Sequence, residues 1–229
     1  MILLTTDTSG KNGSVALARA TEGSKPEQVQ VIDSVPLAGG TFSAQLVPQI
    51  ADLLKKHDFR KGEIDAFVVV SGPGSFTGLR VGLAAIKALA ETLRKPIVAV
   101  SLLEVVALAA GKQGRVLAVL DAGRAELYAG EYEIAGDARL VHPGLIQEKL
   151  VRKDDLAQFT HVPAIFTPDP SLAAKLRDSG LAVFQVEAVM PQMIAALGWR
   201  KLLVGSVVSP EQLDANYIRR GAEMVSNPG

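Results

Sequence analysis

The sequence predicts an α/β protein built from two lobes. Short apolar segments alternate with stretches of helical periodicity over most of the 229 residues. Two of the apolar segments end in aspartate, at Asp7 and Asp121, and each is followed by a short turn and a second strand. Because these hairpins begin about half the chain apart, they indicate a duplication in which one hairpin opens each lobe. We place the lobes at residues 1–111 and 112–229, with the boundary in a turn-rich stretch.

The first lobe has the clearer pattern. Its opening strands read as a meander, and its fourth strand has a continuous apolar centre, which is typical of a buried strand. The first helix contains Pro48, which predicts a kink or the end of its first turn. In order, the predicted elements are strands at 2–7, 14–18 and 29–35, a helix at 42–57, a strand at 65–71, a helix at 78–94, a strand at 96–101 and a helix at 102–110.

The second lobe has a weaker pattern. A hairpin runs from residue 116 to Ile134, and Pro191 is well placed in the first turn of a helix. The tail at 226–229 is predicted to be disordered. The remaining predicted elements are helices at 151–158, 171–178 and 191–204 and strands at 164–166 and 181–186.

Composition excludes several classes of protein. Lys and Arg number 24, Asp and Glu also number 24, and aromatic residues make up 5%. A neutral chain with few aromatic side chains is a poor stand-alone nucleic-acid binder. The absence of Cys excludes disulfides and thiolate metal sites. No apolar run approaches the roughly 18 residues needed to span a bilayer, and the N-terminus lacks the basic region of a signal peptide. We expect a cytoplasmic protein.

The loop Ser-Gly-Pro-Gly-Ser-Phe-Thr-Gly-Leu-Arg-Val-Gly, at 71–82, lies between a strand and a helix. Chains bind phosphates or expose nucleophiles in that setting. The loop lacks the Lys of a P-loop and the third glycine of a dinucleotide fingerprint. Ser75 stands one place too early for a nucleophile elbow, and no histidine is evidently poised as its base. A serine peptidase or esterase using Ser75 stays a minor alternative.

The two aspartates leave two interpretations open. They could hold Mg²⁺ through water in a nucleotide cleft, which would indicate a stand-alone ATPase or kinase. Alternatively, each caps its own turn. The candidate nucleotide or phosphate cleft comprises Asp7, Thr8, Ser9, Gly72, Gly74, Ser75 and Asp121. No two histidines have the spacing that would place a metal-binding pair on a helix.

The helix at 78–94 has an unusually wide apolar surface. Its charged residues, Arg80, Lys87, Glu91 and Arg94, fall within a narrow arc, and the other positions are apolar or small. Such a helix packs on two sides. One side belongs to the sheet, and the other to a neighbouring helix of this chain or to another protein. Gly82 lowers helix stability and therefore needs a packing reason.

Several motifs together resemble the TsaB/YeaZ family of tRNA threonylcarbamoyladenosine biosynthesis proteins. They are Asp7-Thr-Ser9, Ser14-Val-Ala-Leu17, the loop at 71–82, and Asn216-Tyr-Ile-Arg219. The similarity is strong over residues 1–110 and patchy afterwards. It implies the two-lobed actin-like ATPase fold, a duplicated ribonuclease H-like architecture.

The resemblance also implies a function. We expect a non-catalytic subunit that scaffolds and activates a TsaD-type paralogue, which transfers threonylcarbamoyl to the adenosine beside the anticodon. A TsaE-type ATPase would join the complex, and tRNA would be reached only through it. We expect no cofactor of this chain's own, with ATP and Mg²⁺ possible in the complex, no membrane association, and a homodimer when the chain is alone.

In the family, the pairing surface comes from the first two helices, here about 42–57 and 76–94. The resemblance thus predicts an interface made of Phe42, Leu46, Ile50, Gly78, Val81, Gly82, Ala85 and Leu89. The scaffold interpretation further predicts that Gly82→Leu or Ala85→Glu abolishes pairing while leaving the fold intact. Two departures from the family pattern are Phe42, where many members have His, and Gly123 before Arg124.

Overall fold

The computed structural model consists of two compact units. It describes every residue except 22, 24, 26–27, 135–143, 160–161, 163, 187–190 and 219–229. The first unit comprises Met1–Leu102 and Met190–Asn216, and the second comprises Leu103–Val189 and Tyr217–Gly229. The chain therefore passes between the units three times, whereas the predicted lobes, 1–111 and 112–229, imply a single passage.

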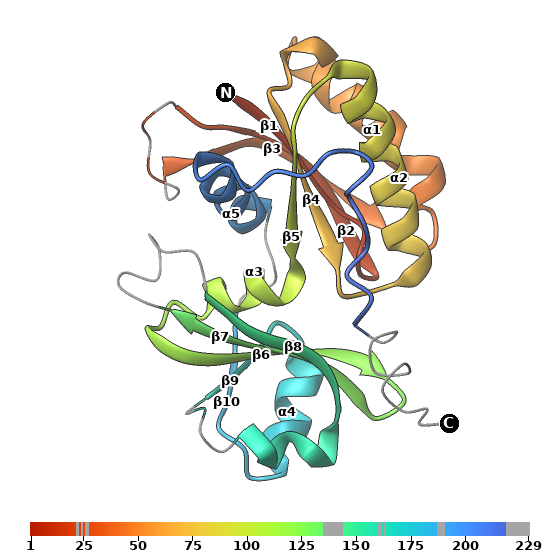
Figure 1. The fold of residues 1–229 in the computed structure, drawn as a ribbon. Coiled ribbons are helices and arrows are strands. Elements are labelled where there is room, and N and C mark those ends of the chain that lie inside the picture. Colours follow the sequence, from red (N-terminus) through yellow and green to blue (C-terminus); the bar gives the residue numbers. More distant parts are fainter. Residues whose placement is uncertain are drawn as a thin grey trace, which may run out of the picture. The chain divides into compact units, whose positions relative to one another are not determined.

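The first unit contains a five-stranded sheet with the order β3-β2-β1-β4-β5 (Figure 1). The first three strands form the predicted antiparallel meander, and the last two run parallel to β1. The strands are β1 (Ile2–Asp7), β2 (Asn12–Arg19), β3 (Gln30–Ala38), β4 (Ala66–Gly72) and β5 (Ile97–Ser101).

The second unit repeats this sheet. Its order, read from the other edge, is β8-β7-β6-β9-β10, again an antiparallel meander followed by parallel strands. This repetition confirms the duplication and the two-lobed actin-like architecture. The strands are β6 (Gly114–Gly123), β7 (Glu126–Ile134), β8 (Gly144–Arg152), β9 (Ile165–Thr167) and β10 (Val183–Gln185).

In each unit, one helix packs against a sheet other than the one it follows in the sequence. For this reason the predicted lobe boundary differs from the observed division into units. Helix α3 (Leu102–Ala109) follows β5, yet its apolar side chains join the core of the second unit with Val116 and Tyr132. Helix α5 (Pro191–Leu203) follows β10, yet it packs on the sheet of the first unit. A boundary set by turn residues alone cannot show which sheet a helix covers.

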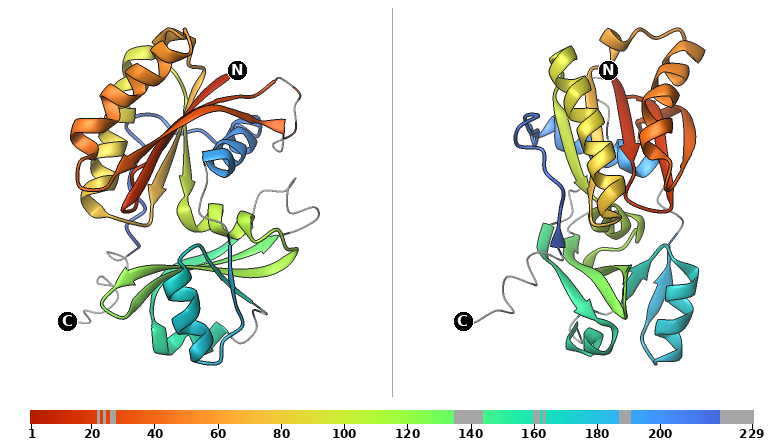
Figure 2. Two further views of the ribbon diagram at one scale, coloured as in Figure 1. Left: turned by 180° about the vertical axis from the view of Figure 1, so that it is seen from behind. Right: turned by 90° about the vertical axis from the view of Figure 1, so that its right-hand side faces the viewer.

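Helices cover both faces of the first sheet. Helices α1 (Phe42–Lys56) and α2 (Phe76–Leu93) lie side by side on one face, and α5 covers the other (Figures 1 and 2). Along β1, Ile2 and Leu4 join the core under α1 and α2, whereas Leu3 joins the core under α5. This alternation is the expected result of side chains pointing to opposite faces of a strand.

Several predictions differ from the structure in detail. Strand β8 was not predicted, because its centre, Gln147–Lys149, is polar and the strand lies at the edge of its sheet. The predicted helix at 151–158 is a short 3₁₀ helix, η3 (Lys153–Phe159). Helix α1 ends at Lys56, one residue before its predicted end, and contains Pro48. The predicted disorder at 226–229 lies outside the described residues. The remaining elements are η2 (Lys61–Glu63) and α4 (Pro170–Asp178).

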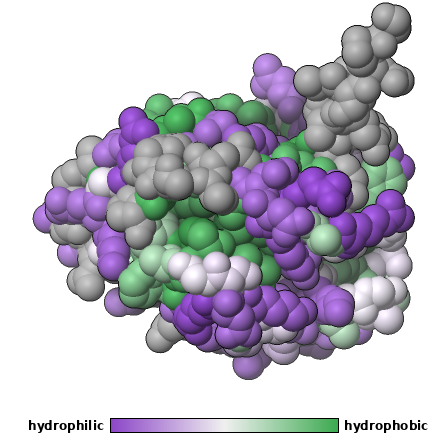
Figure 3. Space-filling view, turned by 90° about the horizontal axis from the view of Figure 1, so that it is seen from below, coloured by the Kyte–Doolittle hydropathy of each residue, from purple (hydrophilic) through white to green (hydrophobic). Residues whose placement is uncertain are grey.

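Among the described residues, no helix combines the length and apolarity needed to cross a membrane. One face of the molecule, shown in Figure 3, carries mainly hydrophilic side chains around a central apolar area.

Candidate functional site

The loop between β4 and α2 positions the start of α2. Ser75 is its N-cap, and the Ser75 hydroxyl accepts a hydrogen bond from the Gly78 N–H at 3.3 Å. The Ser75 N–H donates to the Ser9 carbonyl oxygen at 2.6 Å. The loop is therefore bonded to the turn that follows β1. Ser75 therefore caps the helix that this loop begins.

The glycines of the motif allow that turn to lie directly against α2. A Cβ added at Gly74 would collide with the Ser9 carbonyl oxygen, and one at Gly78 would collide with the Thr8 carbonyl oxygen. A Cβ at Gly82 would collide with the Thr8 hydroxyl. The packing reason expected for Gly82 is thus a contact within this chain. Gly82→Leu would disturb the fold itself, contrary to the prediction that it spares the fold.

Asp7 closes the turn after β1. Its Oδ1 accepts hydrogen bonds from the Ser9 N–H at 2.8 Å and from the Ser9 hydroxyl at 2.5 Å. The residue is 8% exposed. Burial raises the pKa of the Asp7 carboxyl above its ordinary value, and the two bonds from Ser9 oppose that shift. Asp7 therefore acts as a buried cap within its own turn.

Asp121 has the same bond in a different setting. Its Oδ1 accepts from the Gly123 N–H at 2.8 Å, and the side chain is exposed. The turn that follows is left-handed at Arg124, with φ 55°, and at Ala125, with φ 61°. The interpretation that each aspartate caps its own turn is confirmed. Asp7 and Asp121 belong to different units.

Two N–H groups and one carboxylate of the candidate cleft in the first unit are engaged within the protein. A phosphate cradle needs N–H groups directed outward. Here the N–H groups of Ser9 and Ser75 donate within the protein. Mg²⁺ needs accessible, ionised carboxylates, whereas Asp7 is buried and engaged with Ser9. Gly72, with φ 124°, is packed against Asn216.

Ser75 is exposed, but the described residues do not pair it with a histidine. His57 lies at the C-terminal end of α1, where its Nε2 is 2.7 Å from Asp33 Oδ2 on β3. His142 and His161 lie outside the described residues. The part of the chain that the structure describes also contains no group of three potential metal-ligating side chains.

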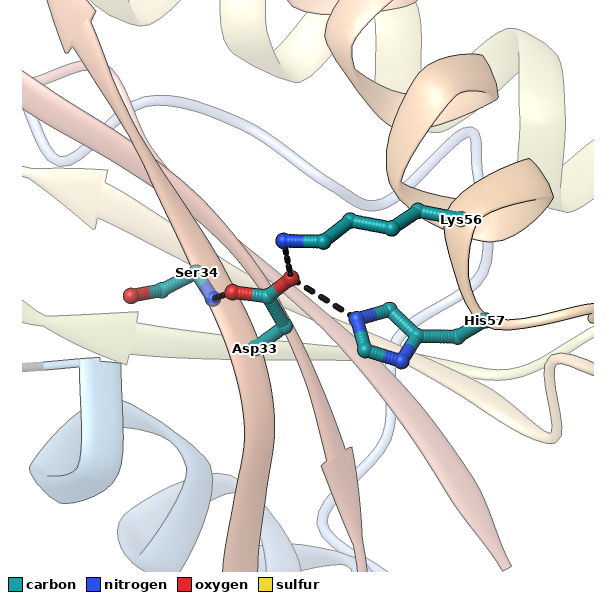
Figure 4. A network of polar contacts seen from close by, with 4 residues as sticks. All are labelled: Asp33, Ser34, Lys56 and His57. Atoms are coloured by element: carbon teal, nitrogen blue, oxygen red, sulfur yellow. Dashed lines mark hydrogen bonds and ion pairs between the residues drawn. The ribbon is translucent and has the colours of Figure 1, made fainter.

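The contact of His57 belongs to a polar network that joins α1 to β3 (Figure 4). The Lys56 ammonium donates to the same Asp33 oxygen at 2.7 Å, and the Ser34 N–H donates to the other oxygen at 2.8 Å. The bonds from His57 and Lys56 hold the pKa of the Asp33 carboxyl well below its usual range. The network is structural, since it fastens one end of α1 to the edge strand.

The side chains expected at a partner interface lie mostly inside the first unit. Phe42, Leu46 and Ile50 are at most 4% exposed and belong to the core beneath α1. Gly78 and Gly82 are buried against Thr8. The remaining three, Val81, Ala85 and Leu89, are half-buried at the edge of that core.

The second side on which α2 packs is supplied by this chain. Helix α1 lies beside it, and a Cβ at Gly78 would meet the ring of Phe42. Residues after α5 also join its core, namely Val208, Leu213 and Ala215. The wide apolar arc of α2 is therefore accounted for by the sheet, by α1 and by this C-terminal segment.

Helices α1 and α2 nevertheless share an exposed surface without charges, which we call the uncharged face. On α1 it consists of exposed residues that precede Asp52, a part of the helix in which every residue is neutral. Among them, Val47 is 52% exposed. On α2 it lies between the side that contacts α1 and the charged arc of Arg80, Lys87 and Glu91. Its members are Ala44, Val47, Pro48, Ala51, Thr77, Val81, Ala84, Ala85 and Ala88.

Sequence reasoning found only two members of this face, Val81 and Ala85. The signal for the others was present in the sequence, since no charged residue occurs from Phe42 to Ala51. The apolar residues of α1 at helical spacing form the core, so the exposed members had to be sought at the intervening positions.

Comparisons with known proteins give one consistent result. Residues 36–196 match the family described as "TsaD: tRNA N6-adenosine threonylcarbamoyltransferase". The chain is 33% identical over 135 residues to the Bacillus subtilis tRNA threonylcarbamoyladenosine biosynthesis protein TsaB, an alignment that covers 58% of this chain and 56% of that protein. It is 25% identical over 198 residues to the Escherichia coli protein of the same name, covering 81% and 84% respectively.

A solved structure extends the match over both units. YeaZ from Pseudomonas aeruginosa superposes with a TM-score of 0.72 at 25% identity and covers 94% of this chain and 100% of that one. The family match, the relatives and this structure agree with the motifs around Asp7 and the loop before α2. The chain belongs to the TsaB/YeaZ family, within the wider group that the threonylcarbamoyltransferase model matches.

Proposed function

We propose that this protein is a non-catalytic subunit in the biosynthesis of threonylcarbamoyladenosine in tRNA, and that it pairs with a TsaD-type paralogue. The names of the relatives support the pathway. The turn after β1 and the loop before α2 support a non-catalytic role, because the Ser9 and Ser75 N–H groups and the Asp7 carboxylate form hydrogen bonds within the protein. A stand-alone ATPase would need those groups for phosphate and metal.

One observation carries the pairing part of the proposal, namely the uncharged face of α1 and α2. The exposed side of a surface helix normally carries charged residues. Two adjacent helices that lack them over the same face, with Val47 half-exposed at its centre, present a surface suited to close packing against another protein. Alanines at five positions on it would allow a partner helix to approach closely.

The other parts of the proposal follow from this pairing. Threonylcarbamoyl transfer, and any ATP or Mg²⁺ that it requires, would be supplied by the TsaD-type and TsaE-type subunits. Because this chain is neutral overall, tRNA would be held by the complex as a whole. The chain alone would self-associate through the same face. We expect the protein to act in the cytoplasm, together with the tRNA that the complex modifies.

The test introduces a charge into the uncharged face. Val47→Glu on α1 and Ala88→Glu on α2 should weaken binding to the TsaD-type paralogue by roughly 30-fold or more, because an unpaired carboxylate would be buried in the interface. Affinity is measured by calorimetry, and the mass of the complex by light scattering after size exclusion. Ala174→Glu on α4, an equally exposed alanine in the second unit, is the matched control.

The same variants test the pathway. The reconstituted complex with the wild-type chain should form threonylcarbamoyladenosine in tRNA, as measured by nucleoside analysis. Complexes with Val47→Glu should form much less, and those with Ala174→Glu should match the wild type. If both face variants bind the paralogue with wild-type affinity, the uncharged face is not the pairing surface. Formation of the nucleoside without this chain would contradict its proposed role.

A further inference from the structure

The segment that follows α5 lies along α2, on the first unit. The chain leaves α5 at Leu203, and residues 206–216, here called the strap, run beside α2 before the chain enters the second unit at Tyr217 (Figures 1 and 2). The strap has no regular secondary structure apart from one bridge to β5. It is nevertheless fastened at several points, each of which involves an element that supports α2.

The first fastening is to the edge of the sheet. The Val208 N–H donates to the Ile97 carbonyl oxygen on β5 at 2.9 Å. Just before the strap, the Lys201 ammonium donates to the Ala99 carbonyl oxygen at 3.2 Å. These bonds satisfy backbone groups that an edge strand otherwise leaves open.

The second fastening is hydrophobic. Leu213 is 1% exposed and belongs to the same core cluster as Leu83 and Ile86 of α2. A tight turn presents it, since the Leu213 N–H donates to the Ser209 carbonyl oxygen at 3.0 Å. The Ser209 hydroxyl also accepts from the Gln212 N–H at 3.3 Å. Burying one leucine fixes the centre of the strap against the helix.

The third fastening is to the loop that starts α2. The Asn216 N–H donates to the Ser71 carbonyl oxygen at 2.8 Å. A Cβ at Gly72 would lie 3.1 Å from the Asn216 carbonyl oxygen, so the strap passes close above this glycine. The hydrogen bond with the Ser209 side chain is the main cause that lowers the pKa of Glu211 in the strap, and Lys87 of α2 makes a smaller contribution.

We propose that the strap is a conformational device that holds α2 in the position required for partner binding, so that its release switches pairing off. This rests on the proposed function, since the uncharged face lies on α2. Helix α2 has α1 on one flank and the strap on the other. Only the strap is irregular, and a single buried leucine anchors its centre, so the strap is the flank that can open with the least loss of structure.

The experiment removes that anchor and compares it with an equivalent loss elsewhere. Leu213→Ala is paired with Leu37→Ala, in which a leucine of equal burial is truncated in the same core cluster but on β3. Hydrogen exchange of the free proteins is followed by mass spectrometry over residues 71–90. Leu213→Ala should accelerate exchange there by about tenfold or more relative to Leu37→Ala, because the opening is local. Affinity for the TsaD-type paralogue should fall in parallel.

Equal exchange over 71–90 in the two variants overturns the proposal, whatever the paralogue does. Faster exchange in Leu213→Ala with wild-type affinity for the paralogue also overturns it, because the strap would then hold α2 without affecting pairing. Failure of the wild-type chain to bind the paralogue would instead refute the proposed function, and exchange alone would then decide whether the strap holds α2. If Leu213→Ala does not fold, Ser209→Ala, which removes the turn bond to Gln212, provides the same comparison.

Discussion

The two units share one sheet topology but use the turn after their first strand differently. In the first unit, the turn after β1 is covered by α2, with Asp7 buried and Thr8 packed against glycines. In the second unit, the corresponding turn after β6 leaves Asp121 and Arg124 exposed. The same sequence signature, an apolar strand ending in aspartate, therefore produces a packed turn in one unit and an open turn in the other.

The helices that follow the fourth strand of each unit also differ between the two units. Helix α2 has 18 residues, whereas α4, at the equivalent place in the second unit, has 9. The exposed side of α4 carries Lys175, Arg177 and Asp178, as an ordinary surface helix does. Among its described residues, the second unit has the same sheet order but no pair of long helices with a shared uncharged face. The partner-binding capacity that we propose therefore belongs to one copy of the duplicated fold.

Gly82→Leu tests whether the covered turn is essential, and it has the largest expected effect. The new side chain would collide with Thr8, which is held between β1 and α2. We expect a loss of about 3 kcal/mol in the free energy of unfolding, measured by urea denaturation. Ala84→Leu, on the exposed side of the same helix, should change it by less than about 0.5 kcal/mol. A folded Gly82→Leu protein of wild-type stability would contradict the packing described above.

Truncating the two aspartates compares the turns directly. Asp7→Ala leaves the buried N–H and hydroxyl of Ser9 without their acceptor, so we expect a loss of about 2 kcal/mol. Asp121→Ala exposes its turn N–H to water, and the loss should be about 0.5 kcal/mol. Both values come from chemical denaturation at pH 7. Equal losses in the two variants would show that the turns are equivalent after all.

Asp7 also has a pH signature. Because burial raises its pKa in the folded state, the folded chain binds a proton more readily than the unfolded chain just above pH 3.8. The contribution of Asp7 therefore favours folding at low pH and falls as pH rises through that window. Asp7→Asn keeps an acceptor for Ser9 but cannot ionise, so it lacks this fall. Plots of the free energy of unfolding against pH for the wild type and for Asp7→Asn should therefore diverge as pH rises.

Relieving backbone strain in the open turn should stabilise the protein. Ala125 has a left-handed conformation, which glycine adopts without the penalty of a Cβ. We expect Ala125→Gly to raise the free energy of unfolding by about 0.5–1 kcal/mol. Ala84→Gly, the same substitution within α2, should lower it by a similar amount. A destabilising Ala125→Gly would show that the turn is held by contacts that outweigh its conformation.

The sequence was informative where a pattern is local. Alternation and helical spacing located β1 to β5, α1 and α2 within a few residues, and the paired hairpins indicated the duplication. The sequence pattern did not show which elements pack together when they are far apart along the chain. Nothing local shows that α3 and α5 pack on the opposite unit, and the polar centre of the edge strand β8 has no apolar alternation.

The candidate site shows the same division. A packing reason for Gly82 was expected from its residue type and its place in a helix, and its contact with Thr8 supplies one. Phe42, Leu46 and Ile50 were placed at the interface because they are apolar, yet apolarity at helical spacing first predicts a core. Val47 was missed because a single exposed valine becomes meaningful only when the neighbouring helix is known to be uncharged as well.

The smallest expected effect concerns the polar network at the end of α1, where the half-buried carboxylate of Asp33 can be compared with the buried carboxylate of Asp7. Asp33 has a lowered pKa, the opposite of Asp7, so its contribution is present above its ordinary pKa of 3.8 and is lost as pH falls below it. Asp33→Asn should lower the melting temperature slightly at pH 7 and should flatten its dependence on acid. Salt should weaken the wild-type contribution, because Lys56 is largely exposed. Asp58→Asn, an exposed neighbour, is the control. If Asp33→Asn and wild type show the same acid dependence, the bonds from Lys56 and His57 do not fasten α1 to β3 in solution.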